Sequence, residues 1–398
     1  MTTVLTPSRR RFLQALGATA ALPTITLPGF VTATDDAPKG GNILVLVELA
    51  GGNDGLNTVI PTRDPAYHAL RPEIGLRRSN TLTLDRETGL HGSLREVAAL
   101  WDQGDLQIVE GVGYPEPNRS HFRSIEIWNA GFGSASTTRQ GWVSHAFDAE
   151  KVQNRDVDGL VLGGDMGPLR GPGRFSAMRD IEAFLESHVN LTASPHSVRP
   201  AAATSPLDHV LATYDSARIT GDAIRQRLER SPSRRLSFPD SGLGAQLRTA
   251  ARLLDAGVEV PVLKVVQDGY DTHEAQPDAH ADLLRELSEA LGAFARALQQ
   301  IGLWDRVTVL TYSEFGRTAR ENASFGTDHG TAAPLFVLGG RVSGGLQGAR
   351  PDLTRLVDDD LVHTTDYRQV YDGLLQDLWG IDVQFSGTQT TPVSILRP

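Results

Sequence analysis

The chain has 398 residues, of which 40% are hydrophobic, so it can bury one large core or two smaller ones. A formal net charge of -10 argues against nucleic acid or an anionic membrane as a partner, because both require a basic face. The sequence contains no cysteine, which excludes disulfides, thiolate metal ligands and a cysteine nucleophile. Any metal site must therefore be built from oxygen and imidazole ligands.

The N-terminus has the features of an export signal. The stretch from Ser8 to Gln14 reads Ser-Arg-Arg-Arg-Phe-Leu-Gln, an alanine-rich apolar run follows to about Phe30, and small residues end at Ala33. This pattern resembles a twin-arginine signal. We expect residues 1–33 to be a signal peptide read by the twin-arginine export machinery, and residues 34–398 to form a single periplasmic or secreted domain. No other run is long enough to span a membrane.

The first strand of the domain is predicted over residues 42–49, an almost continuous apolar run typical of a parallel strand covered on both faces. Two glycines, Gly51 and Gly52, follow it and permit a tight turn at the carboxyl end of the strand. Open α/β sheets bind ligands at that edge. Asp54 is therefore a candidate metal ligand, although Asn-Asp-Gly is equally typical of an ordinary turn.

A helix over residues 93–101 and a strand over 106–109 come next, and a further helical pattern runs from Phe122 to Trp128. Ser120 thus lies close to a helix N-terminus, where backbone N–H groups favour an anion. It is a helix cap, a nucleophile or a ligand, and these roles are compatible. The stretch at about 148–240 is rich in Gly, Pro, Ser and Arg, and we expect an insertion or cap around the core there, with a short strand at 159–163 and helices at 182–188 and 207–228.

The core pattern returns with a helix at 243–256 and a strand at 260–266, whose exit carries Asp271 and His273. A long helix over 277–301 and a strand over 307–312 follow. Glu314 and Arg317 come after that strand, and Asp328 and His329 lie on the loop entering the next one, at 334–339. A last helix is predicted over 367–378. Alternating strands and helices predict an α/β fold with a mainly parallel sheet and helices on both faces.

Six candidate site residues lie at predicted strand ends, so one edge of a single sheet can gather them: Asp54, Ser120, Asp271, His273, Asp328 and His329. Carboxylates and imidazoles suit divalent cations, and two ions about 4 Å apart can clamp both oxygens of a phosphoryl transfer. A serine beside such an ion would be an activated nucleophile, and Arg317 or Arg123 would neutralise a substrate oxygen. Glu314 would ligate a further ion or orient Arg317.

The motif series also resembles a known family. Gly51-Gly-Asn-Asp-Gly55, Asn118-Arg-Ser-His-Phe122, Asp271-Thr-His273, Ser313-Glu-Phe-Gly-Arg-Thr318, Thr327-Asp-His-Gly330 and His363-Thr-Thr-Asp-Tyr367 look like the bacterial proteins grouped as domain of unknown function 1501. The resemblance extends from Asn42 to Leu378. That family is in turn similar to the alkaline phosphatase and sulfatase superfamily, which implies a three-layer α/β/α sandwich with a two-metal site.

The resemblance implies roles for individual residues. Asp54 would be the first aspartate, Ser120 the nucleophile, Asp271 and His273 the first distal pair, and Asp328 with His329 the adjacent pair; His363 or His280 would be the third histidine. The distal pair departs from the superfamily, which has three residues between its aspartate and histidine, whereas Thr272 alone intervenes here. One metal site is altered or missing on this reading. The expected cofactor is one or two divalent ions, with zinc as the first candidate.

Two classes of function stay open. The first is an exported metal-dependent hydrolase of phosphate or sulfate esters, acting on a small-molecule or polymer-linked substrate. The second is a non-catalytic protein that binds the cell envelope or a polysaccharide with the same fold. A sulfatase of the formylglycine type is disfavoured because there is no cysteine, and export argues against a phosphomutase-like isomerase.

Overall fold

The computed structural model of the protein describes residues 41–149, 155–189, 206–231, 234–387 and 390–397. The export signal expected over residues 1–33 lies outside them. Residues from Gly40 to Pro398 form one compact unit.

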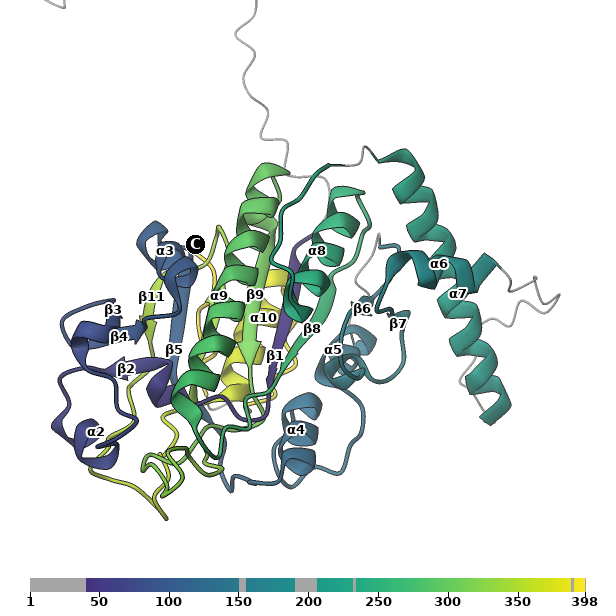
Figure 1. Cartoon of the computed structure of the whole chain (residues 1–398). Helices are drawn as coiled ribbons and strands as arrows, with labels where there is room; N and C mark the ends of the chain where they lie inside the picture. Colours follow the sequence, from purple (N-terminus) through teal and green to yellow (C-terminus); the bar gives the residue numbers. More distant parts are fainter. Residues whose placement is uncertain (1–40, 150–154, 190–205, 232–233, 388–389, 398) are drawn as a thin grey trace, which may run out of the picture. The chain divides into compact units, whose positions relative to one another are not determined.

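A nine-stranded sheet runs through this unit (Figure 1). Its strand order is β11-β5-β10-β9-β1-β8-β6-β7, and β12 pairs with β5 beside β11. Every pairing is parallel except those of β10, which runs antiparallel to both of its neighbours, β5 and β9. The strands are β1 (Ile43–Ala50), β5 (Leu106–Gly113), β6 (Gly159–Val161), β7 (Phe175–Ala177), β8 (Val262–Asp268), β9 (Val307–Tyr312), β10 (Ala333–Leu338), β11 (Gly345–Gln347) and β12 (Thr365–Asp366).

Helices cover both faces of the sheet. Successive side chains of a strand point to opposite faces, and in β1 Val45 and Val47 enter one apolar core while Leu44 and Leu46 enter another. The first core contains side chains of α3 (Arg95–Gln103), α8 (Gly242–Asp255) and α9 (Gln276–Gln300). The second contains side chains of α4 (His121–Ala130), α5 (Trp142–Ala149) and α10 (Tyr367–Trp379). The expected α/β/α arrangement with a mainly parallel sheet is confirmed.

The elements predicted from the sequence are present with shifted ends, and the described chain holds others that were not predicted. A small antiparallel sheet, in the order β2-β4-β3, is formed by β2 (Val59–Pro61), β3 (Thr81–Thr83) and β4 (Thr88–His91), next to α2 (Pro65–Leu70). The stretch at 148–240 contributes β6 and β7 to the main sheet, together with α6 (Ile181–Val189) and α7 (Pro206–Arg230). None of the described helices is both long and apolar enough to cross a membrane.

Candidate metal-binding site

One edge of the main sheet collects the loops that carry the candidate residues. Strands β1, β5, β8 and β9 share one direction, so their carboxyl ends meet at this edge, and the antiparallel β10 begins there. The β1 loop touches the β8 loop through Gly51, which has φ +118°, and a Cβ on it would lie 2.4 Å from the backbone nitrogen of Asp271. Only glycine permits this approach. The loops that follow β1 and β8 are therefore packed backbone to backbone.

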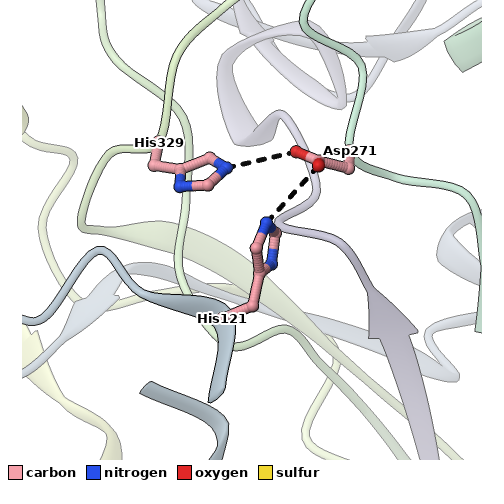
Figure 2. Close-up of side chains that lie close together, drawn as sticks. All are labelled: His121, Asp271 and His329. Carbon is pink, nitrogen blue, oxygen red and sulfur yellow. Dashed lines mark hydrogen bonds and ion pairs between the residues drawn. The ribbon is translucent and has the colours of Figure 1, made fainter. Parts of the chain in front are cut away.

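Three side chains from three of these loops form a cluster (Figure 2). Asp271 follows β8, His329 precedes β10, and His121 is the first residue of α4. The Nε2 atom of His329 lies 3.2 Å from one carboxylate oxygen of Asp271, and the Nε2 atom of His121 lies 3.4 Å from the other. The carboxylate is thus held between two imidazole rings.

A fourth side chain, His273, lies against the same group. Its Nε2 atom is 2.9 Å from the Nε2 atom of His329 and 2.9 Å from Asp271 Oδ1. Two ring nitrogens and a carboxylate oxygen therefore approach one another at hydrogen-bond distance.

The other nitrogen of each ring is held by an oxygen atom. His121 Nδ1 lies 2.7 Å from Glu314 Oε1, and His329 Nδ1 lies 2.8 Å from the carbonyl oxygen of Arg119. His273 Nδ1 lies 3.4 Å from Asp328 Oδ1. A carbonyl oxygen accepts hydrogen bonds but cannot donate them, so Nδ1 is the protonated nitrogen of His329. In the tautomer protonated at Nδ1, each of the three rings directs the lone pair of its Nε2 atom towards the cluster.

The electrostatic environment favours the metal-binding forms of these groups. Burial alone would raise the pKa of Asp271, but hydrogen bonding and charge from Arg317, with help from His329 and His273, bring that pKa below its ordinary value. Burial lowers the pKa of His329, although its contacts with Arg119 and Asp271 oppose the shift. An ionised carboxylate and a neutral imidazole are the forms that ligate a metal.

The donor set fits a small divalent cation. Tetrahedral zinc with Zn–N distances of about 2.0–2.1 Å has neighbouring donor atoms roughly 3.3 Å apart. The Nε2 atoms of His121, His273 and His329 lie 2.9 to 3.4 Å from carboxylate oxygens of Asp271. Histidine that ligates zinc also usually donates its other N–H to a carboxylate or a backbone carbonyl. The Nδ1 contacts of the three histidines have this form.

Arg317 holds together the backbone of the loops around the site. Its side chain is buried, and its guanidinium donates to the carbonyl oxygens of Gly52 at 2.6 Å, Thr327 at 3.1 Å and Tyr270 at 3.0 Å, and also to that of Gly51. It lies 2.7 Å from Asp271 Oδ1 as well. The expected role of neutralising a substrate oxygen requires a guanidinium directed at the substrate, whereas this one is directed at backbone carbonyls and at Asp271. Arg123 is similarly engaged, with Nη2 on the carbonyls of Ser134 and Ser136.

Glu314 and Ser120 lie where the sequence predicts, after β9 and at the start of α4, but their contacts differ from some of those expected. Glu314 is buried and accepts from the backbone N–H of Gly51 as well as from His121, so it orients a ring rather than Arg317. Ser120 occupies the N-cap position of α4, yet its side chain makes no capping hydrogen bond and is exposed. Its hydroxyl is available to a ligand.

The structure does not bring Asp54, His280 or His363 into the cluster. Asp54 is buried and pairs with Arg71, with Nη1 and Oδ2 2.7 Å apart. His280 is buried on α9 and its Nε2 atom contacts Asn53 Oδ1 at 2.9 Å. His363 is half-buried beside Gly113, and within the described chain no hydrogen bond or ion pair joins it to the cluster. His121, rather than His280 or His363, is the further histidine that lies in the cluster.

His121 was not among the ligands predicted from the sequence, because the residue before it, Ser120, has the more familiar role at a helix N-terminus. The sequence feature that could have identified it is its position at the start of a helix that follows a strand. From that position the ring can reach the edge of the sheet. Asp271, His273, Asp328 and His329 were found by the strand-end rule. The structure brings these four and His121 together.

The fold and the cluster define an α/β protein with a candidate metal site at the carboxyl edge of its sheet. The chain belongs to the family described as protein of unknown function (DUF1501), whose sequence profile matches residues 108–375, more than half of the chain. His121, Asp271, His273 and His329 all fall inside the matched region. No curated protein matches the chain.

Several solved structures have a similar chain arrangement at low identity. Ps i-CgsB in complex with k-i-k-neocarrahexaose has 11% identity and a TM-score of 0.41, covering 88% of this chain and 74% of its own. The lipoteichoic acid synthase LtaP from Listeria monocytogenes has 9% identity and a TM-score of 0.41, with coverages of 89% and 76%. A protein in the alkaline phosphatase superfamily from Vibrio parahaemolyticus has 12% identity and a TM-score of 0.39, with coverages of 87% and 68%. At these scores nothing about activity follows from the likeness.

Proposed function

We propose that the protein is an exported metal-dependent hydrolase of phosphate or sulfate esters. The observation that carries the proposal is the 2.9 Å approach of His273 Nε2 to His329 Nε2, beside Asp271 Oδ1. When both rings are protonated at Nδ1, where each has an oxygen acceptor, the two facing Nε2 atoms both carry lone pairs. Facing lone pairs repel, and a carboxylate oxygen beside them adds to the repulsion. A positive charge among these atoms, a proton or a metal ion, relieves it.

A metal ion is the positive charge proposed at this position. His121 Nε2 is directed at the same carboxylate, so His121, Asp271 and His329 together offer three ligand atoms to one ion. A divalent cation can accept lone pairs from His121, His329 and Asp271 at once. When bound, such an ion supplies Lewis-acid polarisation of an ester oxygen and activation of a nucleophile.

The remaining residues supply binding and positioning. Glu314, the Arg119 carbonyl and Asp328 orient the three rings, and Arg317 holds Asp271. Ser120 precedes His121 directly, and its exposed hydroxyl is free of a capping bond. In this proposal Ser120 Oγ bonds to the phosphorus or sulfur atom while the ester alcohol departs with the serine proton. Water then releases the acid and restores the hydroxyl.

The test joins metal analysis to a panel of ester substrates. Protein collected after export should contain zinc or another divalent ion and should hydrolyse a phosphate or sulfate ester. His329→Ala should lose both the metal and the activity, whereas His68→Ala, an exposed residue of α2, should change neither. A wild-type protein that carries no metal after saturation would refute the metal site.

Ser120→Ala separates the two functional classes. An enzyme with a serine nucleophile should keep its metal and lose turnover by about 10²-fold or more. Unchanged turnover would remove Ser120 from the mechanism. Metal binding without hydrolysis of any ester in the panel would favour the alternative, a protein that binds the envelope or a polysaccharide.

A further inference from the structure

Asp54, expected from the family resemblance as a metal ligand, has its carboxylate filled by protein donors. Its Oδ1 atom accepts from the backbone N–H groups of Leu56 at 3.2 Å and Asn57 at 3.3 Å. Its Oδ2 atom accepts from Arg71 Nη1 at 2.7 Å and from Gln276 Nε2 at 2.5 Å. An ionised carboxylate has about four lone-pair sites. These four donors use them, so no lone pair is left for a metal ion.

Arg71 is built into this position. Its side chain is fully buried, and besides Asp54 it donates to Asn57 Oδ1 at 2.8 Å and to the carbonyl oxygens of Thr318 at 2.9 Å and Ala319 at 3.0 Å. A guanidinium does not lose its proton in a protein. The positive charge beside Asp54 is therefore permanent. Burial works to raise the pKa of Asp54, but Arg71, with smaller contributions from His280 and Gln276, brings that pKa below its ordinary value.

Gln276 connects this ion pair to the cluster. Its side chain is buried, and its Oε1 atom accepts from Thr272 Oγ1 at 3.2 Å and Thr327 Oγ1 at 2.6 Å. Thr272 lies between Asp271 and His273, and Thr327 precedes Asp328. Through Gln276, the Arg71–Asp54 pair thus supports the two loops that carry Asp271 and Asp328. The charges of Arg71 and Asp54 are paired with each other.

We infer that Asp54 is not a metal ligand, that Arg71 provides the fixed positive charge at this position, and that the protein holds one metal ion per chain. The inference rests on the proposed metal site of His121, Asp271 and His329. A second cation at Asp54 would have to displace a buried guanidinium that donates to three other acceptors, and it would meet a like charge if the guanidinium stayed. The family resemblance implies a site with two metal ions. In this protein we infer that one ion and the side chain of Arg71 take their places.

Metal stoichiometry tests the inference on the full chain. The wild-type protein is stripped with a chelator, saturated with zinc and passed through gel filtration, and the zinc per chain is measured by mass spectrometry. The expected value is one. Asp54→Asn should lower the melting temperature but keep one zinc and the zinc-induced rise in melting temperature. Asp64→Asn, at the N-cap of α2 without a buried arginine partner, is the matched control and should behave like the wild type in zinc content. His329→Ala should lose the zinc.

The outcomes distinguish the two proposals. Two zinc ions per wild-type chain would overturn this inference and leave the proposed metal site standing. Zero ions would overturn the metal site and this inference with it. If Asp54→Asn does not fold, the wild-type count still decides, because it needs no variant.

Discussion

Replacing His280 by glutamine should reduce the sensitivity of the fold to acid. His280 is 2% exposed on α9, and burial lowers its pKa from 6.5 to about 4, against the opposing charge of Asp54. The unfolded chain takes up a proton on this ring near pH 6.5, whereas the folded protein does so only near pH 4. The contribution of neutral His280 to the free energy of unfolding is therefore complete above pH 6.5 and is lost as the pH falls towards 4.

The size of the effect follows from the difference between the two pKa values. A difference of about 2.5 units corresponds to about 3 kcal/mol over the whole range, and most of it, about 2 kcal/mol, should be lost between pH 7 and pH 4.5. Glutamine does not titrate, and its amide can still donate to Asn53 Oδ1, the partner of His280 Nε2. The variant should therefore keep the fold but lose this part of the pH dependence.

Urea unfolding of chelator-treated protein at pH 7 and pH 4.5 measures the difference. Metal must be removed because metal affinity itself depends on pH. The free energy of unfolding of the wild type should fall by about 2 kcal/mol more than that of His280→Gln. His68→Gln, exposed on α2, should follow the wild type. Equal losses for the wild type and His280→Gln would show that His280 is not a buried neutral histidine, and the reasoning from burial would fail.

Three further predictions concern the ring orientation, the framework and export. Glu314→Gln should weaken zinc binding about 10–100-fold in chelator competition, because His121 loses its carboxylate acceptor, whereas Glu126→Gln on the exposed side of α4 should not. Arg317→Lys should lower the free energy of unfolding by about 2–4 kcal/mol, since lysine cannot reach all the buried acceptors; an unchanged urea midpoint would contradict this. Changing Arg9 and Arg10 to lysine should keep the precursor in the cytoplasm, and normal accumulation outside it would reject the export signal.

The large elements were predictable because their apolar patterns are long. The run at residues 42–49 predicts a strand buried on both faces, and in β1 neighbouring side chains do enter two different cores. The direction of β10 was not predictable, since an apolar run reads the same in a parallel or an antiparallel strand. Strands of three or four residues, such as β2 and β4, are too short to show a period. The small antiparallel sheet was missed for that reason.

The site was partly predictable for a related reason. The strand-end rule finds Asp271 and His329 because parallel strands direct their exits to one edge. It cannot tell a ligand from a turn residue, and Asp54 looks the same in sequence in either role. The deciding partner is Arg71, 17 positions further on, which only the folded chain brings into contact. Residue types indicate which atoms can bind a metal, whereas tertiary contacts decide which of them are free to do so.

The choice between an enzyme and a binding protein depends on Ser120 more than on the cluster. A metal held by His121, Asp271 and His329 is compatible with both classes, since an ion can anchor an anionic ligand without cleaving it. An N-cap hydroxyl normally stabilises a helix by about 1 kcal/mol through a bond to a backbone N–H, and Ser120 makes no such bond. Ser120→Ala should therefore leave the melting temperature nearly unchanged, against the expectation for a cap. A serine whose removal costs no stability but abolishes turnover would place this chain among the enzymes, because a structural role cannot account for that pair of results.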